Sequence, residues 1–313
     1  MTERYERRGP TDRLIRDLGQ DAFDHLVGLP GADLTSLLLE VMRRRADEES
    51  PASVMRRHER SRFVRPVPVP FARLRQTESV ILASLPDGTE VIPLSPVVPL
   101  GTHSAVAPVD PRVVLATVRG TEVAADPTNG LALIAAERRR TLLRADARSI
   151  ERVKLAAIQR VLRTQRFEGN AAFAHFEIAG FVTAGRVQHD TGFERAALAE
   201  HLLFLVNAFR AAGASHIRVG VTDLTGVSMS ELLDQVVGTL PAVEVVIEPD
   251  RVRGRGYYDR CCFQVYADID GVSEQIADGG LVSWTQQLVA SRKERLCISG
   301  IGVERLALAS STP

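Results

Sequence analysis

The chain has 313 residues, of which 45% are hydrophobic and 25% are charged. It can therefore bury one large core or two modest ones, and its composition is that of an ordinary globular protein. Its 39 basic residues equal its 39 acidic residues, so no overall field draws it to a phosphate backbone. The N-terminal stretch MTERYERRGPTDRL is charged and has no apolar run behind it. We therefore expect no signal peptide, no membrane span and a cytoplasmic location.

The first sixty residues are expected to be helical, with helices at 11–27, 32–45 and from Pro51. Arginines cluster in the second and third of these helices, but acidic residues intersperse them, which favours a solvated face over a nucleic-acid patch. The stretch VRPVPVPF follows, and its alternating prolines exclude a central strand. We place a boundary there, between a small helical N-terminal segment, residues 1–63, and a main domain, residues 64–313.

The main domain mixes helices with strands. Helices are predicted at 72–85, from Pro127, at 193–212 and at 228–237, with Asp126 as a sufficient N-cap for the second. Strands are predicted at 113–119, 216–224, 243–247 and 294–299. Extended segments on both sides of 169–172 predict one antiparallel hairpin, and the Asp270-Gly271 turn predicts another. The fold class is therefore α+β.

The three cysteines form neither a disulfide framework nor a metal cluster. Cys261 and Cys262 are adjacent, so on a strand they point to opposite faces and cannot hold one ion together. We interpret them as small apolar strand residues in a reducing compartment.

Two stretches have the composition of a ligand site. RVRGRGYYDRCCFQ, from Arg251, places an arginine and two tyrosines at the mouth of a strand. GIGVERLALA, from Gly300, places two glycines before a helix that begins with Glu304 and Arg305. Glycines let a backbone approach a flat ligand, and a fixed arginine can stack on a base.

Together these stretches resemble two motifs of the histidyl-tRNA synthetase family. VRGRGYYDRCCFQ is similar to its histidine-specific loop, and GIGVERLAL is similar to the third motif of class II synthetases, whose arginine stacks on the base of ATP. The resemblance implies a class II core, a mostly antiparallel sheet flanked by helices, that pairs as a homodimer. It assigns ATP contacts to Gly300, Gly302 and Arg305, and charge neutralisation during catalysis to Arg253.

The first predicted hairpin resembles the second class II motif, in which an Arg-x-Glu and a phenylalanine meet ATP. Arg166, Glu168 and Phe176 match that outline, with Arg166 on the α-phosphate, while Arg163-Thr164-Gln165 is an alternative register. A planar guanidinium suits that phosphate because it binds two oxygens and stays charged.

The substrate side departs from the family. Ile178 and Val182 stand where the family has a glutamine and a glutamate that line the histidine pocket, so a substrate imidazole would lose partners worth about 1 to 3 kcal/mol each. ADGGLVSW keeps the two glycines of the family's GGRYDGL segment and loses its arginine, tyrosine and aspartate. Tyr257 and Tyr258 remain as pocket walls.

The family also has a glutamate-and-threonine loop that holds the amino group of the substrate. Either Thr121-Glu122 or Asp126-Pro127-Thr128 matches it. Glu122 has no evident structural role in the sequence and is our candidate substrate contact.

We therefore expect a protein that binds ATP and Mg²⁺ and activates a carboxylic or amino acid other than histidine as an adenylate, for an acceptor other than tRNA. Because the sequence runs only to Pro313, we expect no anticodon-binding domain of the kind these synthetases have, and the balanced charge also counts against tRNA as partner. One alternative is a regulatory or scaffolding paralog with a protein partner, similar to the regulatory subunit of ATP phosphoribosyltransferase. Another is a relic fold whose arginines only pair with carboxylates.

Overall fold

The computed structural model describes residues 10–165, 173–225, 230–240, 243–251 and 254–310. Arg166, Glu168 and Arg253 of the predicted site lie outside these residues. The chain divides into two compact units. One comprises residues up to Arg60 with Thr117–Gly120, and the other comprises Ser61–Ala116 with Thr121–Pro313.

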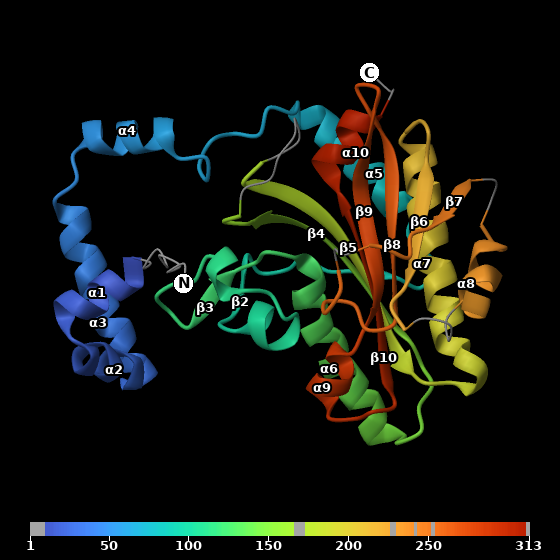
Figure 1. The fold of residues 1–313 in the computed structure, drawn as a ribbon, viewed down its shortest axis with the longest axis horizontal. Coiled ribbons are helices and arrows are strands. Elements are labelled where there is room, and N and C mark those ends of the chain that lie inside the picture. The colour runs from blue at the N-terminus through green and yellow to red at the C-terminus, as the bar shows by residue number, and fades with distance from the viewer. Residues whose placement is uncertain (1–9, 166–172, 226–229, 241–242, 252–253, 311–313) are drawn as a thin grey trace, which may run out of the picture. The chain divides into compact units, whose positions relative to one another are not determined.

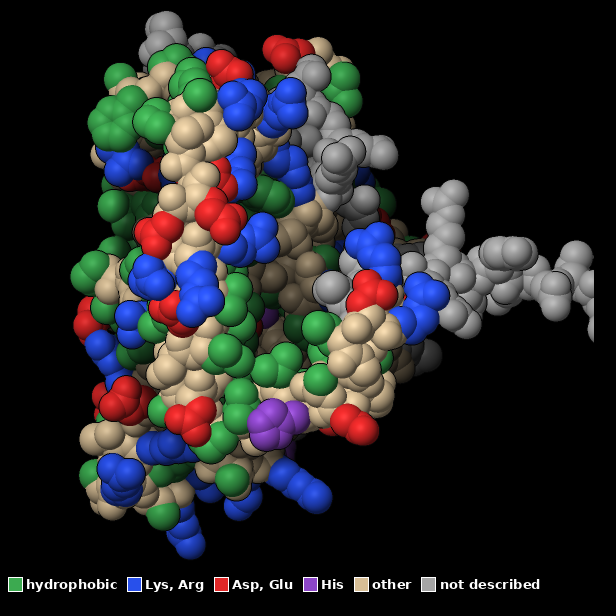
Figure 2. Space-filling view, turned by 90° about the vertical axis from the view of Figure 1, so that its left-hand side faces the viewer, with side chains coloured by type: hydrophobic (Ala, Val, Ile, Leu, Met, Phe, Trp, Pro, Cys, Tyr) green, Lys and Arg blue, Asp and Glu red, His purple; other side chains and the backbone are tan. Residues whose placement is uncertain are grey.

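The first unit is helical and has little core. Its helices are α1 (Pro10–Leu18), α2 (Gln20–Gly28), α3 (Gly31–Asp47) and α4 (Pro51–Arg60). The single helix predicted for 11–27 is wrong, because Gly19 adopts φ 89° and separates α1 from α2. No described side chain of α2, α3 or α4 is buried. Arg43 pairs with Glu40 and Asp47, and basic and acidic side chains are interspersed on the face shown in Figure 2.

The second unit is built on a sheet in the order β1-β4-β5-β10-β9-β8-β6-β7 (Figure 1). Its two edge pairs, β1·β4 and β6·β7, are parallel, and the pairs between them are antiparallel. The strands are β1 (Glu90–Val91), β4 (Val153–Leu162), β5 (His175–Arg186), β6 (Arg218–Asp223), β7 (Glu244–Ile247), β8 (Cys261–Ile269), β9 (Val272–Val282) and β10 (Glu294–Gly302). The prediction of a mostly antiparallel sheet flanked by helices is confirmed.

Helices cover both faces of this sheet. The cluster on one face includes residues of α6 (Pro127–Ala145) and α9 (Trp284–Val289). The cluster on the other face includes residues of α5 (Phe71–Ala83), α7 (Gly192–Ala211), α8 (Ser230–Val237) and α10 (Val303–Ala309). Cys261 packs in the α7 cluster and Cys262 in the α6 cluster, as their strand positions predicted. No described helix is both long and apolar enough to cross a bilayer.

The segment before α6 differs from its prediction. Residues 113–119 do not form a regular strand. A short helix, η2 (Pro111–Val113), precedes a single bridge from Ala116 to Glu122. A small separate sheet pairs β2 (Val97–Pro99) with β3 (Thr121–Val123), and the π-helical turn η1 (Thr102–Val106) lies between them in sequence. This segment then enters α6 through the Asp126 cap, as predicted. The last short helix, η3 (His189–Thr191), precedes α7.

Arg139 and His201 are the centres of two polar networks enclosed in the core. Arg139 of α6 pairs with Glu294 of β10 at 2.7 Å, both side chains have 0% exposure, and the guanidinium also donates to the carbonyls of Glu151 and Ser149. His201 of α7 contacts the hydroxyls of Ser299 and Thr183 at 2.8 and 3.0 Å. Each of these networks gives its charged or polar atoms a partner, so both are structural.

A candidate binding cleft on the α6 face

The direction of the side chains on β5 shows which face of the sheet carries the predicted site. A Cβ on Gly180 would lie 2.9 Å from Cγ of Pro127, so position 180 points at the start of α6. Side chains alternate along a strand, so Phe176, Ile178 and Val182 point to the same side. The α6 face therefore holds all three predicted residues of β5.

The pairing register shows which residues of β10, β9 and β8 lie on this same face. Ile178 pairs with Gly302, and Gly180 pairs with Gly300. Gly300 in turn pairs with Asp278 of β9, and Asp278 pairs with Gln264 of β8. A Cβ on Gly300 would meet only Cγ2 of Ile178 within 4 Å, at 3.2 Å. A ligand can therefore approach the backbone at the centre of this row, which is the geometry expected of a cleft floor.

The predicted nucleotide contacts gather at one end of the row. Arg305 extends over Gly302, since Cβ and Cδ of the arginine lie 3.7 Å from a Cβ placed on the glycine. Its guanidinium donates to the carbonyl of Gln275 at 2.6 Å. The structure thus places Phe176, Gly300 and Gly302 on neighbouring strands of one face, with the side chain of Arg305, from the start of α10, beside Gly302.

Arg163, the alternative register of the hairpin, lies at the same end. Its Nε donates to the carbonyl of Ala125 at 2.8 Å, and its Nη2 lies 3.1 Å from Oδ2 of Asp126. The guanidinium carbon is 5.4 Å from the centre of the Phe176 ring. A guanidinium has five N–H donors, so these contacts leave others for a ligand.

Asp126 belongs to this cleft and Glu122 has a different role. Asp126 caps α6 by accepting from N and Oγ1 of Thr128, and its other oxygen meets Arg163. Glu122 is 3% exposed, and its carboxylate accepts from the backbone N–H groups of Gly101 and His103. The structural role that the sequence did not reveal for Glu122 is to hold the η1 turn, so the carboxylate beside the cleft is that of Asp126.

The predicted substrate pocket is filled by protein side chains. Val182 has 0% exposure in the cluster that includes Tyr258 and Trp284. The ring of Tyr258 lies over Gly280, and Tyr257 packs edge-on against both Tyr258 and Trp284. Val182 is therefore a core residue. Ile178 is 6% exposed and packs with Phe176 at the edge of the floor.

Asp278 is a cleft residue that the sequence analysis missed. It lies beside Gly300 on the α6 face, and the Tyr258 hydroxyl donates to its carboxylate. Burial raises the pKa of Asp278, and the carboxylate of Asp126 raises it further. The positive charges of Arg251 and Arg163 oppose this rise in the pKa of Asp278. The sequence offered one indication of this, because Asp278 lies inside the strand 272–282 and the alternation of side chains along a strand places it on one face of the sheet.

Asn129 is a second missed residue. It is 1% exposed in the first turn of α6. Nε2 of His103 accepts from the Ala125 N–H, so Nδ1 carries the proton and donates to Oδ1 of Asn129 at 2.6 Å. The Nδ2 group of Asn129 is left near the Tyr257 hydroxyl without a well-oriented partner among the described residues. A buried donor in that state is costly unless a ligand or water accepts from it.

The two tyrosines remain neutral donors. Burial raises the pKa of Tyr257 and of Tyr258, and the carboxylates of Asp126 and Asp278 raise both further. The α6 face therefore brings two carboxylates, two phenols and an amide near one another.

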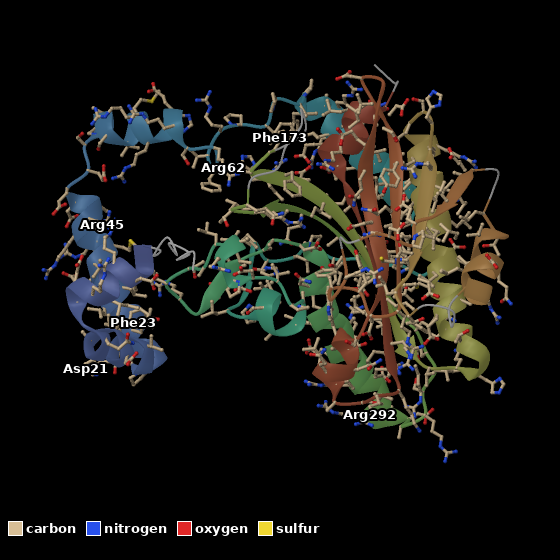
Figure 3. The ribbon with its side chains drawn as sticks, in the orientation of Figure 1. Asp21, Phe23, Arg45, Arg62, Phe173 and Arg292 are labelled. Atoms are coloured by element: carbon tan, nitrogen blue, oxygen red, sulfur yellow. The ribbon has the colours of Figure 1, made fainter. Side chains whose placement is uncertain are left out.

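The end of the β4 strand is also tied to the segment before α5. Arg62, labelled in Figure 3, donates to the carbonyls of Thr164 and Gln165 and stacks on its neighbour Phe63. These bonds fix the backbone that follows Arg163.

A cavity of about 370 Å³ lies elsewhere, near β1 and the second half of α6. Three of its charged side chains are paired, Glu90 with Arg138 and Lys154 with Glu200. We regard it as a surface depression, and the row around Gly300 is the better candidate site.

Comparison with known proteins supports the fold. No protein-family model and no curated protein matches the sequence. An ATP phosphoribosyltransferase regulatory subunit/histidyl-tRNA synthetase from Bacillus halodurans superposes with a TM-score of 0.60, at 14% identity, over 80% of this chain and 82% of its own. The chain has the fold of histidyl-tRNA synthetases.

Two further structures agree. The apo histidyl-tRNA synthetase of S. aureus gives a TM-score of 0.57 at 15% identity, over 76% of this chain and 65% of its own. A histidine-tRNA ligase subunit from Alicyclobacillus acidocaldarius gives 0.59 at 15% identity, over 78% and 94%. The resemblance of the chain to a synthetase core is therefore confirmed at the level of fold.

Proposed function

We propose that the protein binds ATP in this cleft and activates a carboxylic or amino acid other than histidine as an adenylate, for transfer to an acceptor other than tRNA. The observation that supports this is the gathering of Phe176, Gly302, Arg305 and Arg163 at one end of the α6 face. An aromatic ring, an open glycine backbone and two guanidiniums suit a purine and its phosphates.

The residues fit ATP in a definite way. Phe176 and the stem of Arg305 would flank the base, and Gly300 and Gly302 add no side chain of their own to the floor. Arg163 would hold the phosphate or the acid, because it keeps free donors and stays charged. By resemblance, Arg253 would add a further charge. Bound ATP would supply the phosphorus that the acid's carboxylate attacks, with pyrophosphate as the leaving group.

Mg²⁺ would arrive with the phosphates. Among the described residues no cluster of three or more histidine, cysteine or acidic side chains could form a dedicated metal site. Charge stabilisation by arginines and by the nucleotide's own metal ion would therefore carry the catalysis.

The test is exchange of labelled pyrophosphate into ATP with a panel of amino acids, aryl acids and aliphatic acids. We expect exchange with at least one acid, and a loss of at least ten-fold in the Arg163→Ala variant. Arg138→Ala, which breaks a surface pair remote from the cleft, is the matched control. Absence of exchange with every acid, together with no ATP-dependent rise in Tm, would refute the proposal.

A regulatory role is the second candidate, favoured by the filled substrate pocket around Val182. A regulatory subunit needs no adenylate chemistry, and one of the similar structures carries that description. Co-expression with the catalytic subunit of an ATP phosphoribosyltransferase tests it: a stable complex with altered activity supports regulation. Light scattering tests the proposed homodimer, and a low-salt gel shift tests whether tRNA is excluded.

A further inference from the structure

The segment that leads into α5 binds the loop end of the β4-β5 hairpin. Nη2 of Arg62 donates to the carbonyl of Thr164 and, at 3.2 Å, to the carbonyl of Gln165. In Figure 3 Arg62 lies beside this end of the hairpin. The partners are 102 and 103 residues apart in the sequence, so these bonds are tertiary restraints on the hairpin.

The same segment also holds the second strand of the hairpin. Nε2 of His175, at the start of β5, lies 2.8 Å from the carbonyl of Arg65. A carbonyl oxygen can only accept, so Nε2 carries the proton, and Nδ1 accepts from Nη1 of Arg160 at 3.2 Å. Residues 62–65 therefore form a clasp that bonds to both strands of the hairpin.

Thr164 is held at each of its polar groups. Its N–H donates to the carbonyl of Val113 at 3.1 Å, its hydroxyl donates to the carbonyl of Arg112 at 3.0 Å, and its own carbonyl accepts from Arg62. The N–H and the carbonyl belong to the two peptide planes on either side of its Cα, so both planes are fixed. Arg163 shares the first of these planes, and the backbone from which its side chain projects is therefore restrained as well.

Arg163 depends on such a restraint because it lies beyond the end of β4. The ladder of β4 and β5 ends at the pair of Leu162 and His175, and one further bond follows it, from the Arg163 N–H to the carbonyl of Ala174 at 3.0 Å. The ends of an element open more easily than its centre. Since a shift of about 1 Å in a binding group can cost about 100-fold in rate, the position of the guanidinium depends on what holds this end of the hairpin.

We propose that Arg62 is a positioning residue for ATP, which holds the hairpin so that the Arg163 guanidinium meets the phosphates. This rests on the proposed function, in which Arg163 binds the phosphate or the acid, and it assigns the phosphate. Arg62 itself would not touch the nucleotide. Its Nη2 is occupied by two backbone carbonyls, and its guanidinium carbon lies 4.4 Å from the centre of the Phe63 ring.

A clasp that only stabilises the fold would behave differently from a positioning residue. A structural clasp would lower the Tm when it is broken and leave the affinity for ATP unchanged. A positioning residue changes that affinity, and does so only while Arg163 is present. The effects of the two arginines on ATP binding should therefore be non-additive.

Calorimetric titration of the full chain with MgATP tests this. Arg62→Met keeps an apolar stem against Phe63 and removes the donors, so it should weaken ATP binding about ten-fold. The double variant Arg62→Met/Arg163→Ala should bind ATP no more weakly than Arg163→Ala alone. Arg60→Ala, in the last turn of α4, removes the same charge nearby and should leave the dissociation constant unchanged.

Amide hydrogen exchange without ATP is the second measurement. The peptide that contains Thr164 should exchange faster in Arg62→Met than in the native chain, and Arg60→Ala should not change it. The Tm of each variant shows whether it is folded.

Unchanged ATP affinity in Arg62→Met, with or without faster exchange at Thr164, would overturn the inference and leave the ligase intact. An equal loss of affinity from Arg62→Met in the presence and in the absence of the Arg163 side chain would do the same. A native chain that does not bind ATP would overturn both. ATP binding that depends on Arg62, without pyrophosphate exchange with any acid, supports the inference and refutes the ligase.

Discussion

The enclosed polar groups of the sheet and the polar groups of its cleft obey different rules. Arg139 and His201 are fully surrounded, and each faces a complementary partner supplied by the fold. On the α6 face, burial raises the pKa of Asp278 although Arg251 and Arg163 oppose the rise, and Nδ2 of Asn129 has no hydrogen-bond acceptor among the described residues. The two sets of side chains therefore differ in how fully the fold satisfies them, and substitution can test the difference.

The largest effect is expected at the enclosed ion pair. Arg139→Met leaves Glu294 buried without a counter-charge, which should lower the free energy of unfolding by about 3 to 5 kcal/mol in urea melts. Arg138→Met, which breaks the exposed pair with Glu90, should cost less than about 1 kcal/mol. The double variant Arg139→Met/Glu294→Leu should recover most of the loss. Equal costs for the two single variants would remove the distinction between enclosed and exposed pairs.

His201 should make the protein sensitive to acid. Burial lowers the pKa of His201 to about 3, below the 6.5 of an unfolded histidine. The unfolded chain therefore takes up the proton first, and about 2 kcal/mol of stability should be lost between pH 7.5 and pH 5. His201→Leu should remove this slope, and His216→Gln, at an exposed histidine, should retain it. A slope that survives in His201→Leu would contradict the assignment.

Glu78 should have the opposite effect to His201, because its contribution to stability is lost as the pH rises. Burial and the neighbouring Glu177 raise its pKa to about 7, although Arg75 pairs with both carboxylates. A raised carboxyl pKa favours folding at low pH, so about 1 to 2 kcal/mol should be lost as the pH rises from 4.5 to 7.5. Thermal melts of Glu78→Gln should lack this loss. If the variant keeps the native pH profile, Glu78 titrates normally.

The smallest effect distinguishes the two cleft carboxylates. Asp278→Asn should raise stability by about 1 kcal/mol at pH 7, because it removes a charge that burial disfavours. Asp126→Asn should lower stability by about 1 kcal/mol, because it weakens the pair with Arg163. Chemical denaturation measures both. Destabilisation by Asp278→Asn would place Asp278 among the structural residues.

The sequence could predict local elements better than the contacts between them. The Asp270-Gly271 turn, the long helix α7 and the hairpin of β4 and β5 follow from patterns within a few residues, and all three are present. The strand predicted at 113–119 is absent, because a short β-prone run gains a ladder only if a partner lies beside it.

The residues of the cleft were likewise predictable only where they lie in local sequence motifs. Phe176, Gly302 and Arg305 could be located because they lie in motifs with recognisable spacing. Asp278 and Asn129 could not, because their roles depend on β9 lying next to β10 and on the orientation of His103. The structural role of Glu122 could not be predicted for a similar reason, since the backbone N–H groups that it binds belong to Gly101 and His103 at the η1 turn.

The position of β10 has a consequence for how the protein is made. This strand joins the β4-β5 hairpin to the β8-β9 hairpin, yet it follows both of them in the chain. During synthesis the two hairpins emerge first with an open edge each, and such edges attract other strands. The sheet is completed only after β10 has emerged, so aggregation is favoured in the interval before that.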